Sequence, residues 1–182
     1  AGRGECTFYI LPDGTTMIVD AGEFHTGGTR HPMVEQKPDT LTRPYKVYAE
    51  YIKDIIGREK NLSIDYALLT HYHMDHMGRL EKDYERAPEK YIKTGMMALY
   101  DEIPYKKLID RSYPDYSFDP KSKPLKHWNR FVKAKMEQDG LVVEKFERGA
   151  DSECRLVNSP KEYPDFKVID DHGNGLVWNN GE

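Results

Sequence analysis

One short stretch of this sequence brings together side chains that bind metal ions. Three histidines and one aspartate lie within six residues, as His71, His73, Asp75 and His76. Imidazole nitrogens and carboxylate oxygens are the ligands that Zn²⁺ prefers, and they also suit Mn²⁺ and iron. Chance explains the cluster poorly, because the chain has only 7 histidines among 182 residues. The stretch therefore predicts a metal site, the alternative being solvated loop histidines or a helix start capped by Asp75.

The spacing of these side chains allows for one or two zinc ions. Positions i and i+2 of an extended segment point the same way, so His71 and His73 can bind one ion together. Asp75 and His76 follow a turn and could hold a second ion nearby. Two neighbouring metals can share a bridging hydroxide, which is a nucleophile at neutral pH. This chemistry indicates hydrolysis of an ester, an amide or a phosphodiester.

The residues before the cluster predict the elements that position it. The apolar run 64–70 is typical of a buried strand, so the cluster follows the C-terminal end of that strand. Open α/β sheets commonly bind their ligands at this edge. At the start of the chain, strands at 6–11 and 15–20 flank the turn signal 12–14 and predict a β-hairpin.

The predicted strand and the stretch 70–78 together resemble the signature of the metallo-β-lactamase superfamily. The resemblance implies an α/β fold, an αββα sandwich of which this chain is the N-terminal portion. It assigns His71 and His73 to the first metal, and Asp75 and His76 to the second. It also implies that Asp75 orients the nucleophile.

The hairpin carries a second resemblance, to superfamily members of the competence (DNA-uptake) type. The pattern is Gly-x-Gly-acid, followed by a strand that ends in Asp-Ala-Gly. Asp20 at the end of that strand is thereby implied to lie behind the metal site and to orient ligands by hydrogen bonding. A turn-forming residue is the alternative. A long loop over 23–43 follows, from which His25 or His31 could contact substrate, unless both are ordinary exposed residues.

Two amphipathic helices are expected further along the chain. One begins at Pro44 and ends at Gly57, and the other begins at Pro124 and ends at Gly140. The second helix has a cationic face that could follow the phosphates of a nucleic acid, although such faces are more often simply solvated. This face consists of Lys121, Lys123, Lys126, Arg130, Lys133 and Lys135.

The remaining segments predict short strands and turns. Asp110, Arg111 and Tyr113 could line a substrate pocket, the alternative being an ordinary surface loop. His172 falls in a predicted hairpin turn at 171–175, where a solvated side chain is expected. The strands are expected at 106–110, 142–146, 166–170 and 176–178.

Composition limits the classes of function. The net charge of −4 argues against nucleic-acid binding by the whole surface, but local patches remain possible partners for DNA. Cys6 and Cys154 lack metal-type spacing, and two free thiols are expected rather than a disulfide. No apolar run reaches the length of a membrane span and no signal peptide is evident, so a soluble protein is expected. Compartment and oligomeric state are not fixed by the sequence.

The second half of the sequence lacks motifs that the resemblance requires. A complete binuclear site in this superfamily needs a further histidine, a bridging aspartate and a final histidine, but only His127 and His172 follow the cluster. We therefore expect residues 1–182 to form a single domain truncated at both ends, with its best match over 1–80. The expected function is a metal-dependent hydrolase acting on a small molecule or a phosphodiester. The alternatives are a DNA-processing nuclease or phosphodiesterase of the competence type, or a non-catalytic fragment with an incomplete site.

Overall fold

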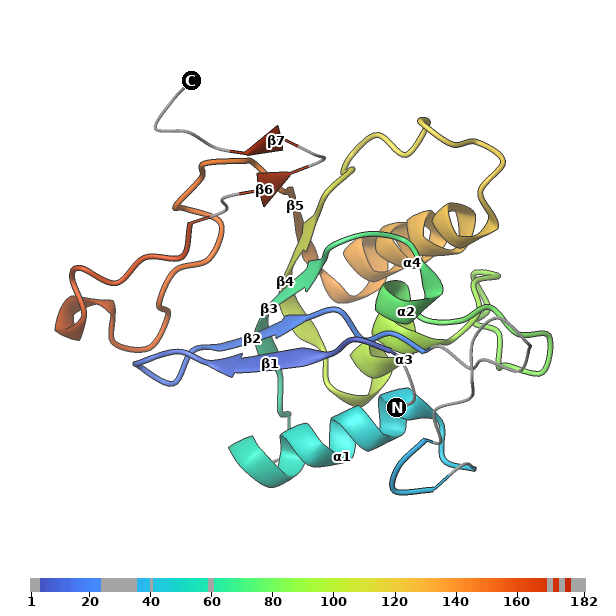
Figure 1. The fold of residues 1–182 in the computed structure, drawn as a ribbon, viewed down its shortest axis with the longest axis horizontal. Helices are drawn as coiled ribbons and strands as arrows, with labels where there is room; N and C mark the ends of the chain where they lie inside the picture. The colour runs from blue at the N-terminus through green and yellow to red at the C-terminus, as the bar shows by residue number, and fades with distance from the viewer. Residues whose placement is uncertain are drawn as a thin grey trace.

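The computed structural model describes residues 4–23, 36–39, 41–58 and 61–169, and the backbone of two short strands near the C-terminus. The predictions for His25 and His31 lie outside these residues. A five-stranded sheet forms the centre of the molecule (Figure 1). Its strands are β1 (Thr7–Ile10), β2 (Thr16–Val19), β3 (Ile64–Leu69), β4 (Tyr105–Asp110) and β5 (Val142–Lys145).

The strands lie in chain order, and four of them run parallel. β1 and β2 form the predicted antiparallel hairpin, whereas β2, β3, β4 and β5 pair in parallel. The pairing places Val19 beside Leu68 and Leu69 beside Asp110. Because parallel strands end at the same edge of a sheet, the residues that follow β2 and β3 meet near the end of β4.

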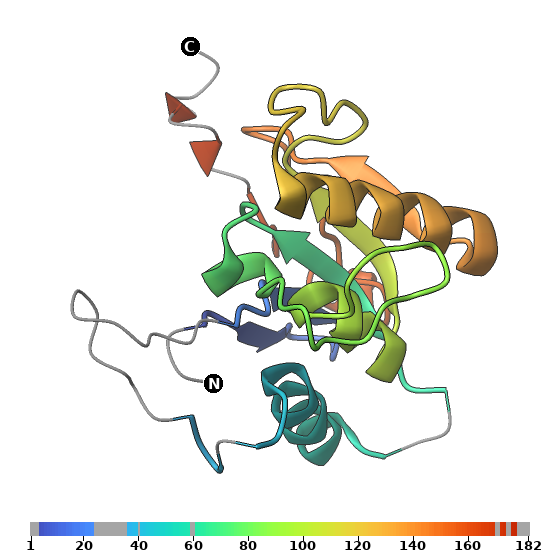
Figure 2. The same cartoon turned by 90° about the vertical axis from the view of Figure 1, so that its right-hand side faces the viewer.

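Helices cover one face of the sheet (Figures 1 and 2). Ile18, Ala67 and Leu108 are neighbours across β2, β3 and β4 and point toward this side. They pack with helical side chains in one large core. Trp128 and Phe131 are its largest members from the last helix and are fully buried. The helices are α1 (Pro44–Ile56), α2 (Met74–Met77), α3 (Gly95–Glu102) and α4 (Lys123–Asp139).

The opposite face of the sheet packs against residues 147–169, here called the covering segment. Met17, Tyr66 and Ile109 point to this side and contact Cys154. The segment has little regular structure beyond the 3₁₀ turn η1 (Pro160–Glu162). Hydrogen bonds to the hairpin hold it against the sheet. Its attachment points on the hairpin are Asp13 and Thr15.

The predicted fold class is confirmed, since a mixed α/β structure with a five-stranded sheet is consistent with a metallo-β-lactamase-like fold. The predicted strand at 166–170 is wrong: residues 166–169 form no strand, because this stretch lies on the sheet's face, where Val168 packs against the smaller core. The C-terminal hairpin is also tighter than predicted, with His172 in a strand rather than in the turn. Its strands are β6 (His172–Gly173) and β7 (Leu176–Val177).

Two further expectations can be compared with the described part of the chain. Cys6 and Cys154 are not joined in a disulfide, as predicted. Within the ranges given above, no helix has both the length and the apolar character needed to cross a membrane.

Candidate metal centre

The predicted ligands lie where β3 gives way to a single helical turn. β3 ends at Leu69, and three residues lead from it to His73, which is the N-cap of α2. The backbone N–H groups of His76 and Met77 donate to the carbonyl of His73 and close the turn. Asp75 therefore comes from the helical turn, whereas His71 comes from the short connection between β3 and that turn.

Three of the four predicted side chains converge. His71, Asp75 and His76 each offer one ligand atom, and these atoms lie within 4.8 Å of one another. The ring centroids of His71 and His76 are 3.8 Å apart, and Nε2 of His76 is 3.7 Å from Oδ2 of Asp75. Two imidazoles and one carboxylate form a donor set suited to zinc and related cations.

His73 lies beside this group rather than within it. Its ring packs edge-on against His71 at a centroid distance of 4.7 Å, and the residue is exposed to solvent. The sequence expectation paired His71 with His73, whereas the group of converging atoms joins His71 to Asp75 and His76. The difference arises because α2 begins at once after His73 and turns the next residues back toward His71.

Asp20 connects the hairpin to this group. Its buried carboxylate accepts hydrogen bonds from the N–H and the hydroxyl of Thr70, at 2.9 and 2.7 Å. The Oδ2 atom of Asp20, which accepts from the Thr70 hydroxyl, also lies 2.7 Å from Nδ1 of His76. A carboxylate can only accept there, so the contact favours the His76 tautomer that carries its proton on Nδ1 and leaves Nε2 available. Asp20 also has a φ of 58°, an unusual backbone conformation for a residue other than glycine.

Glu5 is a neighbour of the site that the sequence did not reveal. Its carboxylate lies 3.7 Å from Nδ1 of His76 and belongs to a second group of close ligand atoms, together with Asp20. The backbone N–H of Glu5 donates to the carbonyl of Asp75 at 2.7 Å. The signal was present as the acid that follows Gly-x-Gly, but the pattern alone indicates only a turn before the hairpin.

The residues after β2 run directly along α2. Ala21 donates to the carbonyl of His76 at 2.9 Å, and Glu23 donates to the carbonyl of Met74 at 2.8 Å. Between them, the backbone of α2 leaves no room for a side chain at Gly22, because a Cβ there would lie 1.6 Å from the carbonyl oxygen of Asp75. Glycine at this position is thus required by the close approach of two backbones.

The electrostatic surroundings affect two groups differently. Burial lowers the pKa of His71, and the neighbouring His76 and His73 lower it further. His71 is therefore favoured in its neutral form, which is the form that binds metals. Burial raises the pKa of the Cys6 thiol to about 12, and the negative charge of Asp20 adds to this effect. Cys6 thus remains protonated near neutral pH and is a poor nucleophile.

Other candidates from the sequence have different roles. Asp110 is fully buried and accepts hydrogen bonds from Tyr72, so it supports the structure instead of facing a substrate pocket. Nδ1 of His127 accepts a hydrogen bond from the backbone of Ile92 at 3.2 Å. On the cationic face of α4, Lys135 forms ion pairs with acidic neighbours at 3.1 and 3.2 Å. The side chain of His172 lies outside the described residues.

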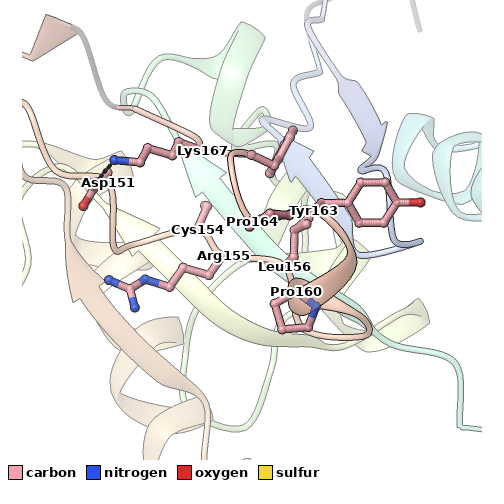
Figure 3. A pocket seen from close by; sticks show the side chains of 9 residues that line it. Asp151, Cys154, Arg155, Leu156, Pro160, Tyr163, Pro164 and Lys167 are labelled. Atoms are coloured by element: carbon pink, nitrogen blue, oxygen red, sulfur yellow. Dashed lines mark hydrogen bonds and ion pairs between the residues drawn. The ribbon is translucent and has the colours of Figure 1, made fainter.

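A separate pocket of about 250 Å³ opens in the covering segment (Figure 3). Lys167 and Asp151 form an ion pair of 3.2 Å among its lining residues. Cys154 also lines it, with its sulfur 3.9 Å from that of Met17. None of the predicted metal ligands lines this pocket, which is formed by the covering segment and not by the edge where β3 ends.

Comparison with protein families assigns the N-terminal half of the chain. The model of the metallo-beta-lactamase superfamily matches residues 1–93. The chain belongs to this superfamily. The match includes the hairpin, β3, α2 and all four predicted ligands. Searches among curated proteins and solved structures gave no match. Membership in a superfamily composed mostly of hydrolases suggests a metal-dependent hydrolase, without identifying the substrate or the metal.

Proposed function

We propose that this chain provides the metal-binding motif of a hydrolase, with His71, His73, Asp75 and His76 as ligands of one or two zinc ions. The observation that carries the proposal is the convergence of His71, Asp75 and His76 within 4.8 Å. It occurs inside the segment that matches the metallo-beta-lactamase superfamily.

The donor set fits such an ion chemically. The group offers two imidazole nitrogens and a carboxylate oxygen, which suit zinc best and also accept Mn²⁺ or iron. The hydrogen bond between His76 and Asp20 directs the free nitrogen of the ring toward Asp75. When bound, the ion supplies a Lewis acid and makes water nucleophilic near neutral pH.

The protein's own residues would hold and orient the reacting groups. Asp75 keeps 41% of its side chain exposed, so its carboxylate can accept a hydrogen bond from an attacking water. Asp20 is buried and would hold His76 in one orientation. His73 is exposed, and its ring centroid lies 4.7 Å from that of His71, close enough for the two to share an ion.

Metal titration tests this proposal. We expect the chain to bind Zn²⁺, and we expect His71→Ala or His76→Ala to weaken binding by more than about 100-fold, since loss of an outer partner alone costs 10- to 100-fold. His127→Gln is the control, because His127 is a helical histidine bonded to the backbone of Ile92. Absence of zinc, manganese and iron binding by the unaltered chain would overturn the proposal. Hydrolysis of 4-nitrophenyl acetate and bis(4-nitrophenyl) phosphate would then separate esters from phosphodiesters.

A second candidate is a nucleic-acid phosphodiester, as the competence-type hairpin suggests. Four exposed cations follow one another at helical spacing along α4. The helix begins beside the motif, since the rings of Trp128 and Tyr72 are 6.3 Å apart. Because Tyr72 is the residue between His71 and His73, the first half of α4 lies near the ligand loop. The four cations are Lys123, Lys126, Arg130 and Lys133.

The salt dependence of DNA binding tests this candidate. Replacing Lys126, Arg130 and Lys133 by glutamine should reduce the slope of log Kd against log salt by about 2 to 3, because each lost phosphate contact contributes about 0.9. The matched control replaces three exposed cations elsewhere, namely Lys145, Arg155 and Lys161. Equal losses in the two triple variants would show that α4 is not a specific path for DNA.

A further inference from the structure

A buried carboxylate at the end of β4 connects the predicted ligand loop to β4 and α4. Asp110 is the last residue of β4 and has no exposed surface. Its Oδ1 accepts hydrogen bonds from the hydroxyl of Tyr72 at 2.5 Å and from the N–H of Ser112 at 3.0 Å. Its Oδ2 accepts from the indole of Trp128 at 2.5 Å and from the hydroxyl of Tyr116 at 2.7 Å. Four donors thus compensate a charge that burial alone would disfavour.

The three aromatic donors come from three different parts of the chain. Trp128 belongs to α4, and Tyr116 belongs to the loop after β4. Tyr72 is the residue between His71 and His73, and it is 9% exposed. Its ring lies near those of Phe118 and Trp128, at centroid distances of 6.1 and 6.3 Å.

The position of Tyr72 has a direct consequence for its neighbours. The rings of His71 and His73 lie together on one side of Tyr72, with their centroids 4.7 Å apart. Because the ring and the hydroxyl of Tyr72 are held in the interior, the backbone from which both histidines project is held with them. The first turn of α2 begins at the same point, so its orientation also depends on where this residue is held.

We propose that Tyr72 and Asp110 are positioning residues for the metal centre, fixing the backbone from which His71 and His73 project. The inference rests on the proposed function, because it assumes that these histidines bind a metal. Neither residue would contact the ion. They act by keeping the ligand loop close to the geometry that binding requires, which must hold within a fraction of an ångström.

The same carboxylate provides a matched control. Tyr116→Phe and Tyr72→Phe each remove one hydroxyl that donates to Asp110. Only Tyr72 lies in the loop that carries histidines. A purely structural role for Asp110 predicts similar consequences of both substitutions, whereas a positioning role predicts that metal binding responds to Tyr72 alone.

The experiment compares both variants with the unaltered chain by zinc affinity, measured in competition with a chelator, and by the visible spectrum of the Co²⁺ form. We expect Tyr72→Phe to weaken zinc binding about 10-fold or more and to change the Co²⁺ spectrum, with less than about a twofold change for Tyr116→Phe. Urea unfolding of both variants checks that their losses of stability are similar.

The outcomes separate this inference from the function on which it rests. Metal binding by the unaltered chain with no difference between the two variants would overturn the positioning role alone. No metal binding by the unaltered chain would overturn both proposals. If Tyr72→Phe does not fold, Asp110→Asn serves as the second variant, and unchanged zinc affinity in that folded variant would contradict the inference.

Discussion

Residues 1–93 and residues 94–169 hold the predicted ligands in different ways. The first region contains the predicted ligands, and its N-terminal residues contact α2 through backbone hydrogen bonds, from Glu5 to Asp75, from Ala21 to His76 and from Glu23 to Met74. The second region contains no predicted ligand and reaches the ligand loop through side chains that meet at Asp110. One region thus brings the donor atoms together, and the other fixes the loop that carries them.

The two kinds of contact differ in their sensitivity to sequence. Backbone hydrogen bonds form with almost any side chain, so their one strict requirement is space, which Gly22 provides. The contacts at Asp110 depend on hydroxyl and indole groups at defined positions. The family match over residues 1–93 therefore includes the predicted ligands but not the contacts that the second region provides.

The backbone contact is expected to fail abruptly. In Gly22→Ala the new Cβ would lie 1.6 Å from the carbonyl oxygen of Asp75, so the strand end and α2 must separate. We expect a loss of about 1–3 kcal/mol in the free energy of unfolding, as for other overpacked sites. Zinc affinity should fall by more than about 100-fold, because displacement of the backbone disturbs the predicted ligands more than loss of one outer partner does. Urea unfolding and zinc titration measure the two effects.

Gly140→Ala is the control for backbone strain. Gly140 has a φ of 71°, and a Cβ there would meet nothing within 4 Å. The left-handed conformation should cost about 1–2 kcal/mol with a side chain present, while zinc affinity stays unchanged. Equal zinc affinity in both variants would show that the contact between Gly22 and α2 does not position the ligands.

The side-chain contact within residues 1–93 should respond more gradually. Asp20→Asn retains a side chain that tolerates positive φ but replaces the charged acceptor beside His76. We expect zinc affinity to fall about 10- to 100-fold, the range found for partners of metal-bound histidines. Zinc titration and the Co²⁺ spectrum provide the measurement.

Asp65→Asn is a matched control for this substitution. Asp65 also accepts hydrogen bonds from the N–H and the hydroxyl of one threonine, Thr16, and it lies near the start of β3, away from the ligands. Its replacement should lower stability without lowering zinc affinity. A similar loss of affinity in both variants would assign the effect of Asp20 to stability and not to its contact with His76.

Sequence reasoning predicted the elements whose causes are local. The hairpin depends on the turn at 12–14. Helix α1 depends on Pro44 at its start, an apolar stripe along one side and Gly57 at its end. The structure confirms both elements. The stretch 166–169 has the composition of a strand, but it packs flat against the sheet through Val168. Which surface an apolar run buries is decided by tertiary structure, and this prediction therefore failed.

The candidate site was likewise predictable only where its signals are local in the sequence. Residue type and spacing were enough to propose the four ligands and Asp20. The contribution of Glu5 depends on its backbone lying against α2, and that of Asp110 depends on the parallel pairing of β4 with β3. Neither arrangement leaves a periodic signal in the sequence. The signals for ligands are therefore local, whereas those for their support are distributed over the fold.

The smallest expected effect concerns the covering segment, which lies against the face opposite the helices. Asp13 accepts hydrogen bonds from the N–H groups of Asn158 and Ser159 at 2.9 and 2.8 Å, and from that of Thr15 at 2.9 Å. Partial desolvation alone would raise its pKa, but the hydrogen bonds from Ser159, Thr15 and Asn158 outweigh it and lower the pKa to about 2. Because the folded pKa lies below the ordinary value of 3.8, the ionised group stabilises the fold above about pH 4. This contribution should disappear as the pH falls toward 2.

Asp13→Asn should therefore be slightly less stable than the unaltered chain at pH 7, with the difference shrinking at low pH and zinc affinity unchanged at pH 7. Urea unfolding between pH 7 and pH 2 measures the difference. A difference that is constant with pH would mean that the charge of Asp13 does not attach the covering segment, and a change in zinc affinity would mean that the two faces of the sheet are coupled.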